Sequence, residues 1–104
     1  MKSRGAIPDP HAELRDRVFA RVLEGEGETD PALRQAVANR QGVPTDLKAL
    51  VDKIHAHAYK VTDEDMARAQ AKYGDDRMFE IVVSSAIGAA RARLEAGLKA
   101  LDEA

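Results

Sequence analysis

The stretch DDRMFEIVVSSAIGAARARLEAGLKALDEA, residues 75–104, decides the fold. It contains no proline, and its apolar residues recur mostly at steps of three and four, which places them on one side of an α-helix. This large apolar stripe consists of Phe79, Val82, Val83, Ala86, Ala90, Leu94, Leu98 and Leu101. A helix of this length spans about 40 Å, which is more than the rest of a short chain can cover. The stretch therefore predicts a central helix that also contacts a partner.

A second stripe on the opposite face of this helix consists almost wholly of small residues, namely Ile81, Ser85, Gly88 and Ala92. A surface helix needs one apolar stripe, so two stripes indicate a helix that is covered on both sides. The small stripe has two interpretations: close packing within the chain, or packing against the same helix of a second subunit. We expect a homo-oligomer formed through this helix, with these four residues at the interface.

Composition limits the possible functions. The chain has 104 residues, the size of one domain, and a formal net charge of -2. That charge gives no electrostatic case for binding nucleic acid or an anionic membrane. The absence of cysteine excludes disulfides, thiolate metal sites and thiol catalysis. No apolar window of about 20 residues predicts a membrane span, and residues 1–5 do not have the form of a secretion signal. We expect a cytoplasmic protein without metal or cofactor.

Start and stop signals divide the rest of the chain into shorter helices. Residues 1–8 are expected to form a flexible arm, and residues 9–104 a single helical domain. Helix starts are predicted at Asp9-Pro10, Asp30-Pro31, Val43-Pro44 and Thr62, where Asp65 adds a weak capping box. Helix ends are predicted at residues 25–28, Gly42 and Gly74. The prediction is an all-α bundle of about five helices with a long C-terminal helix.

Three residues are candidates for catalysis: His55, His57 and Arg93. The two histidines are two positions apart, so on a helix they point to opposite edges and cannot bind one metal together. Each is either a helix-edge residue or a general acid or base, because histidine titrates near neutral pH. Arg93 either lies along the edge of the core or forms an ion pair, within the domain or across a subunit interface.

Glu80 and Asp76 are acidic residues four positions apart in the first turns of the long helix. Carboxylates there interact favourably with the positive end of the helix dipole. We interpret them as capping residues, with a catalytic carboxylate as the alternative.

Three segments carry a family resemblance: AYKVTDEDM (58–66), YGDDRMFEIVV (73–83) and residues 86–94. They resemble the carboxymuconolactone decarboxylase and alkylhydroperoxidase-D-like family, in which a helix ends at a glycine, an acidic cap follows, and the next helix begins with Phe/Ile-Glu and two hydrophobic residues. The resemblance covers positions 45 to 101. It implies an all-helical fold that forms homo-oligomers.

The peroxidase-type members of that family carry a Cys-x-x-Cys pair and a histidine. Aligned on Gly74, these positions fall on Tyr59, Thr62 and Met66, and none matches. We therefore expect a non-redox, oligomeric binding or accessory module rather than an enzyme. The alternative, by resemblance to the decarboxylase-type members, is a cofactor-free decarboxylase or isomerase. It would act on a small carboxylate or lactone, with histidine and arginine at a subunit interface. The sequence does not identify the ligand.

Overall fold

The computed structural model describes residues 12–103, and the regular secondary structure in this range is entirely helical. The helices are α1 (Ala12–Glu24), α2 (Pro31–Asn39), α3 (Thr45–His57), the short 3₁₀ helix η2 (Ala58–Lys60), α4 (Asp63–Tyr73) and α5 (Asp75–Glu103). The predicted fold class, an all-α bundle of five helices with a long C-terminal helix, is confirmed. The expected arm at residues 1–8, the helix start at Asp9-Pro10 and the third histidine, His11, lie outside the described residues.

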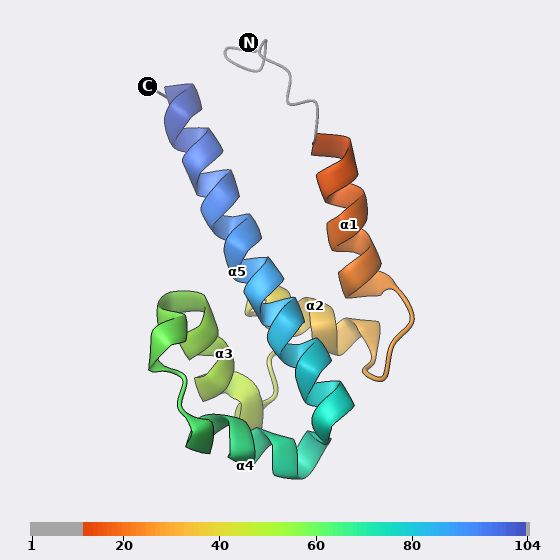
Figure 1. Ribbon diagram of the computed structural model, residues 1–104. Helices are drawn as coiled ribbons and strands as arrows, with labels where there is room; N and C mark the ends of the chain where they lie inside the picture. Colours follow the sequence, from red (N-terminus) through yellow and green to blue (C-terminus); the bar gives the residue numbers. More distant parts are fainter. Residues whose placement is uncertain (1–11, 104) are drawn as a thin grey trace.

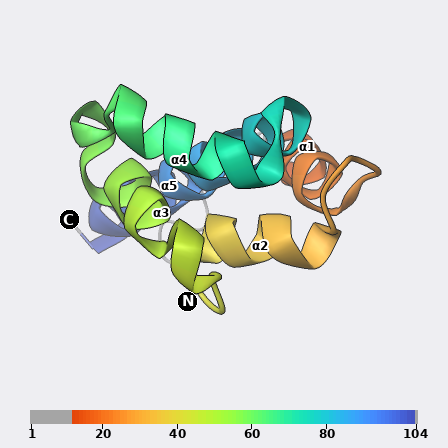
Figure 2. The same ribbon diagram turned by 90° about the horizontal axis from the view of Figure 1, so that it is seen from below.

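The long helix α5 organises the other four (Figures 1 and 2). Its N-terminal half packs against α2, α3 and α4, whereas α1 makes fewer contacts with it. The C-terminal half of α5 extends beyond α2 and α3, with α1 on one side of it (Figure 1). The radius of gyration is therefore 15.6 Å, larger than the approximately 13 Å of a compact domain of this size.

Helix caps explain where the shorter helices begin and end. Asp30 accepts a hydrogen bond from the Ala32 amide, with proline at the first helical position, as predicted. Thr62 and Asp65 form the predicted capping box, with both hydrogen bonds present. The end of α2 differs from the prediction: Arg40, at φ 57° and ψ 40°, is the left-handed C-cap residue, two positions before Gly42.

The hydrophobic core lies between α2, α3, α4 and the N-terminal half of α5. Its buried members are Val37, Leu47, Leu50, Val51, Ile54, Ala69, Met78 and Ile81. The four residues that α3 contributes recur at helical spacing and all face inward, as the sequence predicts. Lys53 and Asp65 join α3 to α4 at 2.7 Å. Two hydrogen bonds lower the pKa of Asp65 to about 2: the larger effect comes from the Lys53 side chain and the next from the Thr62 amide.

The structure corrects the expected roles of the two stripes of α5. Ile81, Ser85 and Gly88 of the small stripe are buried within the chain, so they are not available to a second copy. Ala92 is exposed. The reason is close approach: a Cβ atom at Gly88 would lie 2.0 Å from the carbonyl oxygen of Ala38 in α2. The Ser85 hydroxyl donates to the Ile81 carbonyl within the helix, so this side chain is buried with its hydrogen bond satisfied.

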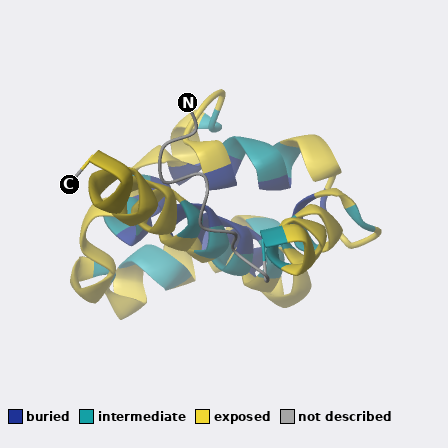
Figure 3. Ribbon diagram, turned by 90° about the horizontal axis from the view of Figure 1, so that it is seen from above, coloured by how far each residue is buried: buried dark blue, intermediate teal, exposed yellow. Residues whose placement is uncertain are grey.

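Much of the large apolar stripe points away from the core. Phe79 is 70% exposed and Leu101 67% exposed, and Ala86, Ala90 and Leu94 are also exposed. Every residue of α5 from 92 to 103 is exposed, and Figure 3 shows this end of the helix from above, with the buried residues below it. We define the outer face of α5 as Phe79, Val83, Ala86, Ala90, Leu94, Gly97 and Leu101.

Candidate functional site

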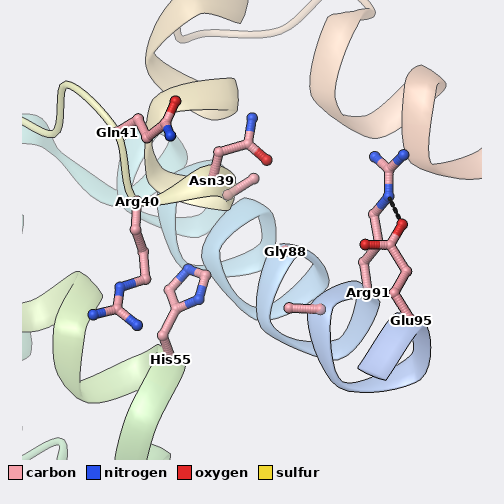
Figure 4. A pocket seen from close by; sticks show the side chains of 9 residues that line it. Asn39, Arg40, Gln41, His55, Gly88, Arg91 and Glu95 are labelled. Carbon is pink, nitrogen blue, oxygen red and sulfur yellow. Dashed lines mark hydrogen bonds and ion pairs between the residues drawn. The ribbon is translucent and has the colours of Figure 1, made fainter. Parts of the chain in front are cut away.

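A pocket of about 760 Å³ opens where the C-terminal end of α2 meets α3 and α5 (Figure 4). Its lining residues are Ala38, Asn39, Arg40, Gln41, His55, Gly88, Arg91, Ala92 and Glu95. α2 ends at Asn39, with Arg40 as its C-cap residue, and Gly88 of α5 lies against the main chain of Ala38 at this end of the helix. Of the three predicted catalytic residues, only His55 lines the pocket.

His55 holds two helices together. Its Nε2 atom lies 2.8 Å from the carbonyl oxygen of Val37, and a carbonyl oxygen only accepts, so the ring donates this hydrogen bond from Nε2. The bond joins α3 to the last turn of α2. Nε2 is therefore committed to the fold, and the acceptor nitrogen of the neutral ring is Nδ1.

The two arginines of the pocket extend in different directions (Figure 4). Arg40 extends toward His55 and forms an ion pair with Asp52, Nε to Oδ1, at 3.6 Å. Arg91 extends toward α1, where its guanidinium carbon lies 5.3 Å from the centre of the Phe19 ring. Its Nε is also 3.4 Å from Oε2 of Glu95. Each guanidinium already has a carboxylate neighbour, so the two do not form a common anion-binding group.

His57 and Arg93 lie outside the pocket lining. His57 is exposed and makes an edge-on ring contact with Tyr59, with 5.6 Å between ring centres. The Arg93 guanidinium donates to the main-chain carbonyl of His55 at 2.7 Å. That carbonyl belongs to the last turn of α3, where helical carbonyls need partners from outside the helix. Arg93 therefore stabilises the end of α3 from α5.

Glu80 binds the connection between α1 and α2, an arrangement that the sequence analysis missed. Its carboxylate accepts hydrogen bonds from the Glu28 amide at 2.7 Å, the Thr29 amide at 2.9 Å and the Thr29 hydroxyl at 2.6 Å. The Thr29 hydroxyl first, and then the Glu28 amide, lower the pKa of Glu80 below its usual value. Gly27 lies against it: a Cβ there would be 2.8 Å from Oε1 of Glu80, so a side chain at this position would displace the carboxylate.

Arg34 completes this arrangement from α2. It is 3% exposed and donates to the carbonyl oxygens of Val22 at 2.6 Å, of Thr29 at 3.4 Å and of Gly25. Its Nε atom lies 4.0 Å from Oε1 of Glu80. Every one of these acceptors belongs to α1, to the connection after it or to α5, so the network joins three segments of the chain. One feature of the sequence points to the buried position of Arg34: it lies three and four residues before Val37 and Ala38, and so on the same side of α2.

Apolar side chains are also exposed on α1. Leu14 is 53% exposed and Val18 50% exposed. Isolated exposed apolar residues are common on protein surfaces, but a continuous apolar patch usually marks a binding surface. The outer face of α5 carries three exposed large apolar side chains, Phe79, Leu94 and Leu101, along one side of one helix.

No group of three or more histidine, aspartate or glutamate side chains in residues 12–103 could hold a metal ion. None of the helices described has the length and apolar character required to cross a membrane. Comparison of the chain with protein-family models, with curated proteins and with solved structures finds no match.

Proposed function

We propose that this protein is a non-redox helical module that self-associates in the cytoplasm and acts by binding. The outer face of α5 is the observation that carries this proposal. Exposing a continuous apolar surface to water is unfavourable for a protein that works as a monomer. The absence of cysteine, together with the resemblance to the carboxymuconolactone decarboxylase and alkylhydroperoxidase-D-like family, favours a member without the thiol centre.

Two of the three expected catalytic residues, His55 and Arg93, make hydrogen bonds that hold helices together. A catalytic base must reach the proton that it removes through a nitrogen that can accept it, and in His55 that nitrogen would be Nδ1. Nε2 of His55 is bonded to the Val37 carbonyl, and Arg93 is bonded to the main chain of His55. Both interactions hold helices together, so both side chains have a structural explanation.

Light scattering across a concentration series tests the proposal. At tens of micromolar, where weak specific interfaces are occupied, we expect a mass of at least two chains of 11.3 kDa. A mass of one chain at these concentrations would contradict it. As a control for the chemistry, the purified metal-free protein should reduce an organic peroxide no faster than buffer, because it has no thiol nucleophile.

A second candidate function is a cofactor-free decarboxylase or isomerase that acts on a small carboxylate or lactone. The observation in its favour is that His55 and Arg40 line one pocket, where the Arg40 side chain extends toward His55 (Figure 4). Titration with a panel of small dicarboxylates, followed by the NMR signals of His55 and by product formation, tests it. Turnover that Arg40→Ala abolishes would favour the enzyme, whereas unchanged signals and no product would exclude these substrates.

A further inference from the structure

The first helix, α1, has fewer buried side chains than another helix of equal length. α1 and α3 both have 13 residues, but α1 buries only Leu23, whereas α3 buries four residues. Among the α-helices of residues 12–103, α1 is also the one that contributes no buried residue to the hydrophobic core. A segment with few buried apolar contacts opens at a lower free energy than the rest of a fold. α1 is therefore attached less firmly than α3.

Polar contacts from α2 and α5 help to hold α1 in place. Arg34 of α2 donates to the carbonyl oxygen of Val22, in the last turn of α1, and to that of Gly25, directly after the helix. Arg91 of α5 lies over the ring of Phe19, 5.3 Å from its centre. Each of these contacts joins α1, or the residue after it, to a side chain of another helix, so movement of α1 away from α2 and α5 breaks them together.

The connection that follows α1 is anchored without any help from α1. Glu80 of α5 accepts hydrogen bonds from the amides of Glu28 and Thr29 and from the Thr29 hydroxyl, and Thr29 is buried. None of these three bonds involves a residue of α1, so they persist when α1 moves. Hinges are usually a few residues at the end of an element. The hinge of α1 is therefore residues 25–27, between the end of the helix and the part of the connection that Glu80 holds.

Arg34 has a second acceptor beside the carbonyl groups that it binds. Its Nε atom is buried and makes no hydrogen bond within the described part of the chain. Oε1 of Glu80 lies 4.0 Å from this atom, too far for a hydrogen bond but close enough for an ion pair. When the Val22 carbonyl moves away with α1, the guanidinium can turn toward Glu80, which replaces the lost acceptor. Arg34 thus has partners in both positions of α1.

We propose that α1 is a hinged helix that opens from α2 and α5 as one unit, while Glu80 keeps the connection in place and Arg34 turns from α1 to Glu80. Opening exposes Leu23 and separates Phe19 from Arg91. Because Arg91 also lines the pocket at the end of α2, the position of α1 determines where this guanidinium lies relative to the pocket. This conformational change does not depend on self-association.

Hydrogen exchange resolved by NMR tests the hinge. A helix of 13 residues is marginal in water on its own, so the amides of α1 exchange once it opens. We expect the amides in the middle of α1 to be protected about ten-fold less than those of Glu28 and Thr29, although the latter two lie outside the helices. Protection of α1 equal to or above that of Glu28 and Thr29 would contradict the hinge.

Leu23→Ala and Leu50→Ala are matched variants, because both leucines are 5% exposed and lie in helices of equal length. Leu50→Ala should reduce protection in α3 and leave α1 unchanged, because α3 is intact in both positions of α1. Leu23→Ala should reduce the protection of α1 by about ten-fold or more. Ile54→Val gives the same comparison as Leu50→Ala with a smaller loss of stability. An equal reduction in α1 and α3 by the α3 variants would show that α1 opens only when the whole chain unfolds, and would contradict the proposal.

The NMR signal of the Arg91 Nε–H group measures the consequence at the pocket. The Phe19 ring shifts this signal while α1 is closed, and Phe19→Leu gives the position of the signal without the ring. We expect the signal in Leu23→Ala to move toward its position in Phe19→Leu. A signal that keeps its wild-type position while α1 loses protection would contradict the link between α1 and the pocket.

Discussion

Gly88 of α5 lies directly against the main chain of Ala38 in α2. A Cβ at Gly88 would lie 2.0 Å from the Ala38 carbonyl oxygen and 2.5 Å from its Cα. Two helices approach this closely only where one of them lacks a side chain. The contact turns the small stripe of α5 inward, which leaves the outer face pointing to solvent. The position of Gly88 therefore determines which surface of α5 is available to a partner.

Replacing Gly88 with alanine is expected to destabilise the fold. The atoms that the new Cβ meets are main-chain atoms of Ala38, which cannot move away by changing rotamer. We expect a loss of about 1–3 kcal/mol or more in the free energy of unfolding, the range for overpacked cores. Urea denaturation followed by the circular dichroism of the helices measures it.

The matched control is Gly97→Ala, nine residues further along the same helix, where the added Cβ meets no atom within 4 Å. Because alanine is the better helix former, this change is expected to stabilise by about 0.5–1 kcal/mol. If both variants were stabilised, the close approach of α5 to α2 would be wrong.

Gly74 separates α4 from α5 with a backbone that other residues avoid. Its φ of 83° and ψ of 168° lie in a region that is essentially restricted to glycine. Gly74→Val should lower the free energy of unfolding by about 1–3 kcal/mol, because a β-branched residue resists positive φ. Thermal unfolding of this variant, compared with Ala71→Val on the exposed side of α4, measures the effect. An equal melting temperature for the two variants would show that Gly74 is an ordinary connecting residue.

The hydrogen bonds of Glu80 make part of the stability dependent on pH. Because its pKa is lowered from 4.5 in the folded protein, folding favours the carboxylate. The resulting stabilisation is fully present above about pH 4.5 and is lost as the pH falls through the lower, folded pKa. Glu80→Gln should therefore cost about 1–3 kcal/mol at pH 7, the range for hydrogen bonds to charged groups.

The difference in unfolding free energy between the wild type and Glu80→Gln should shrink below pH 4.5. Urea titrations at several pH values measure this difference. Glu95→Gln, which removes an exposed carboxylate next to Arg91, is the control and should cost little at any pH. A Glu80→Gln penalty that did not change with pH would contradict the role of the ionised carboxylate.

Local signals in the sequence predicted much of the fold. Helix caps depend on residues a few positions apart, so the caps at Asp30 and Thr62 can be predicted from the sequence alone. The side of α3 that faces the core can also be predicted from the sequence, because its four large apolar residues share one side of the helix. The all-α class follows from these elements.

The orientation of α5 was not predictable in the same way. Side-chain size alone favours burying the stripe that contains Phe79 and Leu94. The opposite outcome depends on the approach of the α2 main chain to Gly88, a contact between residues 50 positions apart. The Glu80 network likewise joins residues 51 and 52 positions apart, so helical spacing cannot reveal it. The burial of Ile81, Ser85 and Gly88 within the chain was not predicted for the first reason, and Glu80 was interpreted as a capping residue for the second.

Sedimentation velocity of wild type and Leu94→Lys tests the central claim, that the outer face of α5 is the surface of self-association. Leu94 is 38% exposed, so a lysine there should leave the monomer folded while placing a charge in the interface. We expect the sedimentation coefficient of wild type to rise with concentration through the micromolar range, and that of Leu94→Lys to stay at the monomer value. Ala71→Lys, on the surface of α4, should behave like wild type. Equal association of wild type and Leu94→Lys, with unchanged helical content, would contradict the account.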